Sequence, residues 1–275
     1  MSEKMTVDLG NVQKTLFLPL WGRAFESKKA RPMLIDPTAV SILEKVDVDF
    51  ATMASGLSKV TQAAWIMRSV LVDETIHNFL KKFPQATIVN IGCGLDTTCD
   101  RVDNGLLTWY DLDLPDVIDL RRKFIPEAER RRMIAASFLD ESWIPTIRVV
   151  ENILFVAAGV FYYFKAAEIR RFLINMTGCF PGSEIIFDVS SSCGVKVANK
   201  MVIQRGGLDE KSFLQWGLDD SNTLLAWDSR IHLLQTLYYF GSKARSFDLS
   251  TRLVGWYSDR LKIQYMLHLR LGDIR

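Results

Sequence analysis

The chain has 275 residues, of which 48% are hydrophobic and 24% are charged, and its 34 basic side chains nearly balance 32 acidic ones. This composition is typical of a globular protein with a sizeable core. The charge balance argues against nucleic-acid binding, which usually shows as a strongly basic domain. The longest apolar run, residues 153–164, is shorter than the about 20 residues that a membrane span needs. We therefore expect a cytoplasmic protein without nucleic-acid or membrane partners.

No tract rich in Pro, Gly or Ser and no internal repeat interrupts the sequence. A single domain over residues 1–275 is therefore the simplest expectation. Within it we distinguish a helical N-terminal extension (1–84), a core (85–190), and a cap with the last strands (191–275). The four cysteines have no metal-ligand spacing. We expect reduced thiols and no metal site.

Residues 12–82 are predicted to be helical. Asp36 and Pro37 are expected to begin a helix, because Asp caps a helix and Pro fits its first turn. Residues 57–83 carry apolar side chains at helical spacing and are followed by Pro84, which predicts that the helix ends there.

From Thr87 onward the sequence changes to short apolar runs. The runs at 87–91, 106–113, 133–138, 152–157 and 183–189 are predicted to be strands. Residues 115–124 and 166–179 between them are predicted to be helices. This alternation indicates a mainly parallel, doubly wound α/β sheet with right-handed crossovers.

The end of the chain is less regular. We expect helical pieces at 196–204 and 209–216, and strands at 231–239 and 262–271. Two basic runs, 121–123 and 130–132, flank Glu127 and Glu129 and are expected to form a solvated charged helix.

The first predicted strand runs into a glycine turn, Gly92-Cys93-Gly94. Glycines let a backbone turn tightly and approach a ligand, and doubly wound sheets bind ligands at the carboxyl ends of such strands. Asp113 ends the next strand about twenty residues later, where an acid reaches ribose hydroxyls. Asp111 lies on the same face, but only Asp113 lies at the tip. A purely structural turn and helix-capping acids remain the alternatives.

A dinucleotide-binding fingerprint would have a third glycine where this sequence has Thr97. That glycine brings the helix close to a pyrophosphate-binding turn. S-adenosylmethionine has an adenosine but no pyrophosphate, so the departure favours a methyl donor over NAD.

The sequence resembles the leucine carboxyl methyltransferases and the related polyketide O-methyltransferases of the tetracenomycin type. The resemblance covers roughly the first two thirds of the chain and is most specific in the GxGxDTT and DLDLP stretches. The matching stretches are residues 21–27, 36–37, Arg68 with Asp73, 89–98, 111–115 and 157–164.

The resemblance implies a Rossmann-like class I methyltransferase fold with S-adenosylmethionine as its cofactor. Arg68 would hold the carboxylate of the donor's methionine part. Gly92 and Gly94 would pass close to the donor's backbone. The remaining implied donor contacts are Leu112, Asp113 at the ribose, Ser137 and Phe138 at the adenine, and Ala158, which stands where the family usually has Glu.

No general base is identified from the sequence, and the three histidines form no motif. A carboxylate acceptor would need none, because a carboxyl group with a pKa of about 4 is already ionised at neutral pH. The leading hypothesis is an O-methyltransferase acting on a carboxylate or hydroxyl of a small molecule or peptide. Residues 195–227 and the N-terminal helices are expected to cover the acceptor, with Trp216, Trp227 and Trp256 as candidate walls.

Two alternatives remain open at this stage. A non-catalytic binding protein that kept the fold is motivated by Ala158 and Ser137. A nicotinamide-dependent oxidoreductase is disfavoured by the missing third glycine.

Overall fold

The computed structural model describes residues 11–50, 58–200, 213–241 and 246–273. Its centre is a seven-stranded sheet in the order β3-β2-β1-β4-β5-β7-β6. β7 runs antiparallel to both of its neighbours, and the other adjacent pairs are parallel. The strands are β1 (Thr87–Ile91), β2 (Thr108–Asp113), β3 (Arg131–Ala135), β4 (Ile153–Ala157), β5 (Ser183–Val189), β6 (Ile231–Tyr238) and β7 (Tyr265–Leu271). The mainly parallel α/β sheet is confirmed, and each strand overlaps its predicted run.

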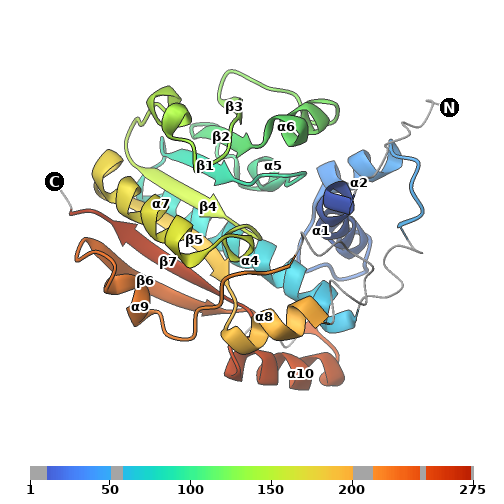
Figure 1. The fold of residues 1–275 in the computed structure, drawn as a ribbon. Helices are drawn as coiled ribbons and strands as arrows, with labels where there is room; N and C mark the ends of the chain where they lie inside the picture. Colours follow the sequence, from blue (N-terminus) through green and yellow to red (C-terminus); the bar gives the residue numbers. More distant parts are fainter. Residues whose placement is uncertain (1–10, 51–57, 201–212, 242–245, 274–275) are drawn as a thin grey trace.

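Helices cover both faces of this sheet (Figure 1). On one face, Ile88, Leu154 and Ile186 pack in a cluster with α4 (Lys59–Lys82). On the other face, their strand neighbours Val89 and Phe155 pack in a cluster with α7 (Ala166–Cys179). Successive strand residues point to opposite faces, so strands that are buried on both sides appear in the sequence as continuous apolar runs.

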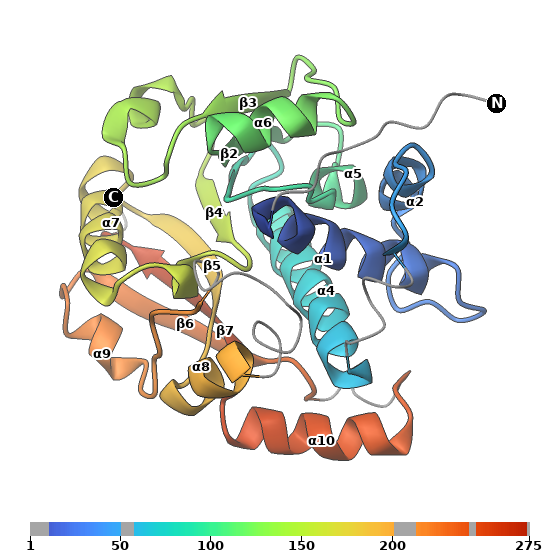
Figure 2. The same ribbon diagram turned by 45° about the vertical axis from the view of Figure 1, so that its right-hand side comes forward.

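The N-terminal helices, α1 (Asn11–Ser27) and α2 (Pro37–Glu44), form a third cluster with the glycine turn. Phe17 and Leu20 of α1 are fully buried there together with Cys93 and Leu95. α6 (Pro115–Arg122) contributes Ile118 from the far side. Figure 2 shows α1 beside α4 and α5 (Thr98–Val102), so the N-terminal extension packs against the carboxyl edge of the sheet.

The predicted helix ends are confirmed where capping chemistry defines them. Asp36 caps α2 by accepting the Ala39 amide at 2.9 Å, and α4 ends at Lys82, two residues before Pro84. The expectation of helix throughout 12–82 is wrong at 28–36 and 45–49, which connect helices or form turns, while 51–57 lie outside the described residues.

The predicted helices in the cap are partly wrong. α8 (Ser192–Ala198) begins before Lys196 because Ser191 caps it by accepting the Gly194 amide. Residues 201–212 lie outside the described part. Residues 213–216 are not helical, because the amides of Gln215 and Trp216 donate to the Tyr162 carbonyl instead of to carbonyls one helical turn earlier.

Four further segments were not predicted from the sequence. α10 (Leu249–Arg260) buries Thr251 and Gly255 and leaves Leu253 and Trp256 more than half exposed. Its apolar side chains therefore point away from the core, which removes the usual amphipathic signal. The others are α9 (Asn222–Leu225) and the 3-10 helices η1 (Glu141–Thr146) and η2 (Phe161–Tyr163).

Two kinds of feature are absent from the residues that the structure describes. No helix there is long and apolar enough to cross a membrane. No group of three or more potential His, Cys, Asp or Glu metal ligands occurs there either.

Candidate active site at the carboxyl edge of the sheet

The glycine turn after β1 is built from two residues that require glycine. Gly92 and Gly94 have φ angles of 61° and 47°, in the left-handed region that side chains disfavour. A Cβ on Gly92 would lie 2.5 Å from Val160 Cγ2, and one on Gly94 would lie 2.9 Å from Leu16 Cδ2. The Gly92 amide donates to the Leu112 carbonyl at 2.8 Å. This turn is therefore tied to the end of β2 and tightly enclosed by α1.

Asp113 lies at the end of β2 and faces the glycine turn. Its Oδ2 accepts the Gly94 amide at 2.7 Å, and its Oδ1 accepts the Leu114 amide at 2.8 Å. It does not cap α6, whose N-cap residue Leu114 has no side-chain cap bond. Burial raises the pKa of the Asp113 carboxyl, and the two amide donors only partly offset this. The carboxylate is fixed beside the turn, where the sequence predicted a ribose-binding acid.

Asp111, two residues earlier, has a different role. It is fully buried and accepts hydrogen bonds from Arg121, Arg131 and Trp109 at 2.8, 3.1 and 2.8 Å. The prediction that 121–123 and 130–132 form a solvated helix is wrong, because Arg121 and Arg131 are buried around this carboxylate and 131–135 form β3. Arg121 also donates to the Gly94 carbonyl at 2.9 Å. Arg121 therefore links the buried Asp111 carboxylate to the glycine turn.

Arg68 reaches the same edge from α4. Its Nη1 donates to Asp188 Oδ2 at 3.2 Å and to the Tyr162 hydroxyl at 3.3 Å, and its side chain is only 12% exposed. Burial by itself would lower the pKa of Arg68, but electrostatic interactions with Tyr162 and Asp188 outweigh it, and the pKa is raised. Arg68 is therefore buried and paired, unlike an ordinary arginine on a helix surface.

Asp188 and Tyr239 belong to this cluster and were missed from the sequence. Asp188, near the end of β5, accepts the Gly159 amide at 2.6 Å and the Tyr239 hydroxyl at 3.2 Å in addition to Arg68. The available signal was an acid near the carboxyl end of an apolar strand run. Strand alternation places Asp188 on the α4 face with Ile186, so Arg68 lies directly within reach.

Comparison with known proteins decides the family. The profile of the leucine carboxyl methyltransferase family matches residues 17–177. The chain is 33% identical over 184 residues to the tetracenomycin polyketide synthesis O-methyltransferase TcmP of Streptomyces glaucescens, covering 66% of this chain and 67% of that one. The chain belongs to the leucine carboxyl methyltransferase family.

Two more distant proteins are similar over nearly the whole chain. The S-adenosyl-L-methionine-dependent methyltransferase dpfgK of Gibberella zeae is 24% identical over 281 residues, covering 93% of this chain and 94% of that one. A solved DUF574-family protein from Streptomyces avermitilis shares the fold with a TM-score of 0.56 at 10% identity, covering 91% and 96% of the two chains. The protein is thus an S-adenosylmethionine-dependent methyltransferase with the class I fold, which decides against the oxidoreductase and the non-catalytic alternatives.

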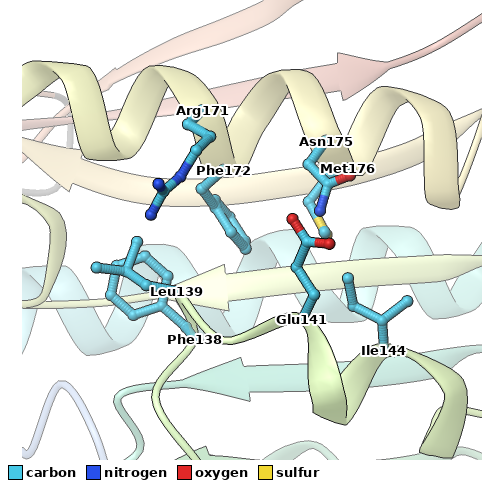
Figure 3. A pocket seen from close by; sticks show the side chains of 8 residues that line it. All are labelled: Phe138, Leu139, Glu141, Ile144, Arg171, Phe172, Asn175 and Met176. Carbon is cyan, nitrogen blue, oxygen red and sulfur yellow. The ribbon is translucent and has the colours of Figure 1, made fainter.

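Ser137 and Phe138 of the methyltransferase follow β3. Ser137 Oγ accepts the Leu139 amide at 3.3 Å and is partly exposed. The Phe138 ring is buried edge-on against Phe164 and Phe172 at 4.8 and 5.2 Å between ring centroids. Figure 3 shows this ring lining a small pocket beside α7.

Leu112 and Ala158 lie at this edge without a polar side chain. Leu112 is fully buried, and its carbonyl accepts the amides of Gly92 and Cys93. Ala158 follows β4 and packs against the α4 cluster. It lies on the same face as Asp188 and Arg68, so the glutamate usual in the family would bring a further charge to this cluster.

Thr97 has a structural role in the methyltransferase that a glycine could not fill. Its hydroxyl donates to Asp36, which also receives Arg23 and Arg101, each at 2.9 Å. Arg23 also donates to the Leu95 carbonyl at 3.2 Å. This buried network attaches α1 and α2 to the segment that leaves the glycine turn, and a glycine at position 97 would remove one of its donors.

The histidines lie away from this edge, whereas Trp216 is joined to it through its backbone, because its amide donates to the Tyr162 carbonyl. His77 is exposed on α4, His232 is the second residue of β6 at the opposite edge of the sheet, and His268 Nε2 lies 2.7 Å from Glu184. Trp216 is buried and stacks on Trp227 at 6.0 Å, in the core on the α7 side. Trp256 is exposed on α10.

The residues at the edge fit S-adenosylmethionine. An acid lies beside the glycine turn at the end of β2, and a buried arginine lies at the ends of β4 and β5. These groups match an adenosyl ribose at one end and an amino-acid carboxylate at the other.

Proposed function

We propose that this methyltransferase transfers the methyl group of S-adenosylmethionine to an oxygen of a small-molecule or peptide acceptor, a carboxylate or a hydroxyl. The similar TcmP protein is named as an O-methyltransferase of polyketide synthesis, which supports oxygen as the accepting atom. S-adenosylmethionine supplies an electrophilic sulfonium methyl group. The chain's own residues bind, orient and shield the reactants.

The proposed donor contacts follow the geometry of the edge. Asp113 binds the ribose hydroxyls beside the backbone of Leu112. The backbone of Gly92 and Gly94 lies close to the donor. Arg68 binds the methionine carboxylate. The adenine lies beside Ser137 and the Phe138 backbone, and Ala158 contributes an apolar wall. The N-terminal extension (1–84) and the last part of the chain (191–275) enclose the acceptor against the core (85–190).

The protonation states of the side chains at this edge favour a carboxylate as the methyl acceptor. Burial raises the pKa of both Tyr162 and Tyr239 well above the ordinary value. At neutral pH these phenols keep their protons, and Asp188 already accepts three donors. A phenol acceptor with a pKa of about 10 would need a base, whereas a carboxylate is already ionised. Catalysis then rests on alignment, which can supply about 7–11 kcal/mol.

The test uses purified protein and S-adenosylmethionine labelled in its methyl group. Matched aryl carboxylates, phenols and anilines are offered as acceptors. We expect label in the carboxylates, released as methanol by mild alkali, because an ester hydrolyses and an ether does not. Label that resists alkali on phenols would move the acceptor to a hydroxyl. Label only on the anilines would contradict oxygen transfer.

A further inference from the structure

The carboxylate of Asp188 joins three elements at one point. Its Oδ1 accepts the Gly159 amide from the turn after β4 at 2.6 Å. Its Oδ2 accepts Arg68 from α4 at 3.2 Å and the Tyr239 hydroxyl, which follows β6, at 3.2 Å. The Asp188 side chain is completely buried. Such a carboxylate cannot itself reach a ligand in solution, so its influence passes through the groups that it holds.

Arg68 is the group on which this arrangement acts. Within the described part of the chain, its hydrogen bonds to Asp188 and Tyr162 both leave from Nη1. A guanidinium has five N–H donors in a rigid fork, which binds a second carboxylate through its remaining edge. Asp188 therefore occupies one end of the Arg68 fork and directs the rest of it.

Gly159 fixes the distance between the guanidinium and the end of β4. Its φ is 83°, and a Cβ there would lie 2.8 Å from Arg68 Nη1. The guanidinium thus lies directly on this turn, and the Gly159 amide is bonded to the same carboxylate. The turn, the arginine and the acid form one packed unit, so the direction of the fork is set before any ligand binds.

Preset direction matters because a free arginine side chain has many rotamers. Ordering such a side chain during binding costs affinity, and holding it beforehand removes that cost. We propose that Asp188 is a positioning residue that holds Arg68 in the orientation that receives the carboxylate of the donor's methionine part, with Tyr239 fixing the acid. This inference rests on the proposed function, in which Arg68 binds that carboxylate.

The test compares two ligands that differ only in the carboxylate. S-adenosylhomocysteine has it, and S-(5′-adenosyl)-3-thiopropylamine is the same molecule without it. Calorimetry gives the ratio of the two affinities for each protein. We expect the wild-type protein to prefer S-adenosylhomocysteine. Asp188→Asn should lower the affinity for S-adenosylhomocysteine by about tenfold, the scale of one charged hydrogen bond. It should change the affinity for the amine by less than about threefold.

Two further variants separate positioning from general damage. Tyr239→Phe removes one bond to Asp188 and should shift the ratio in the same direction by about two- to fivefold. Glu184→Gln is the control, because Glu184 lies on the same strand and pairs with His268 at the other end of the sheet. It should leave both affinities unchanged.

A coupling test completes the experiment. In an Arg68→Met background, Asp188→Asn should no longer change the ratio, because nothing remains for the acid to orient. Equal weakening of both ligands by Asp188→Asn, or no change in either, would overturn the inference. If that variant does not fold, an unmoved ratio in Tyr239→Phe overturns it. A wild-type protein that does not distinguish the two ligands would overturn the role of Arg68 itself, and the inference with it.

Discussion

Asp113 combines a fixed position with an unfavourable environment for its charge. Two backbone amides hold its carboxylate beside the glycine turn, and burial raises its pKa. A group that is held in place before binding loses little freedom when a ribose arrives. The same residue should therefore control both the strength of donor binding and its dependence on pH.

Removing the Asp113 carboxylate should weaken donor binding without unfolding the protein. We expect Asp113→Ala to reduce the affinity for S-adenosylhomocysteine by about 1.5–3 kcal/mol, the value of hydrogen bonds to a charged group. Calorimetry at neutral pH measures it, with circular dichroism to confirm folding. An unchanged affinity would remove Asp113 from the donor site.

The raised pKa fixes the direction of the pH effect. Hydrogen bonds from ribose hydroxyls favour the ionised carboxyl, so binding should weaken as the pH falls through the pKa of Asp113 in the free protein. Because burial raises that pKa, the loss should begin above the value of about 3.9 of an ordinary aspartate. Titrating affinity from pH 7 to pH 4.5 tests this. An Asp113→Asn variant with the same pH profile as the wild type would assign the effect to another group.

Arg121 and Arg122 are adjacent in sequence and opposite in environment. Arg121 is fully buried against Asp111 at 2.8 Å, whereas the Arg122 side chain is 45% exposed. Breaking a buried ion pair on one side costs about 3–5 kcal/mol, and exposed pairs are worth about 0–1 kcal/mol. We expect Arg121→Met to lower the free energy of unfolding by the larger amount and Arg122→Met by the smaller one. Urea denaturation measures both, and similar losses would show that the Asp111 pair does not support the fold.

At the residue scale, the sequence allowed prediction of groups that follow a local motif. Asp113 and the two glycines lie where the strand-turn-helix pattern placed them. Arg121 and Asp188 could not be recognised, because their burial depends on partners that only the folded sheet brings near. Asp188 lies 120 residues from Arg68 in sequence.

Among the elements, the glycine turn between β1 and α5 is the most constrained. Gly94 has a positive φ and Leu16 in contact, while Gly105 has a positive φ of 79° with nothing within 4 Å of an added Cβ. This pair separates backbone strain from crowding.

We expect both Gly94→Ala and Gly105→Ala to lose about 1–2 kcal/mol of stability from left-handed strain. Only Gly94→Ala should also displace Leu16 and weaken S-adenosylhomocysteine. Thermal unfolding and calorimetry on the same samples provide the comparison. Equal donor affinity in the two variants would mean that the turn does not contact the donor.

Helices and strands could be predicted where their buried apolar residues recur at regular spacing in the sequence. The strands and α4 were predicted because their apolar residues face a core. α10 escaped because it packs through Thr251 and Gly255, with Gly255 against Phe240. Small residues on the buried face give no hydrophobic period.

In the whole molecule, the order of strands brings distant residues to one edge. β1 pairs with β2 and β4, and β4 pairs with β5, so their carboxyl ends collect Gly92, Asp113, Gly159 and Asp188. The alternation of strands and helices predicted this edge. The conformation of residues 213–216 in the cap could not be predicted, because backbone bonds such as Gln215 to Tyr162 join segments far apart in sequence.

The central claim is that the donor binds at this edge, between the glycine turn and Arg68. A crystal structure of the protein with S-adenosylhomocysteine tests it most directly. We predict ribose hydroxyls on Asp113, adenosine beside Gly92 and Gly94, and the amino-acid carboxylate on Arg68. A nucleoside bound elsewhere, or an Arg68 without contact to that carboxylate, would contradict the account.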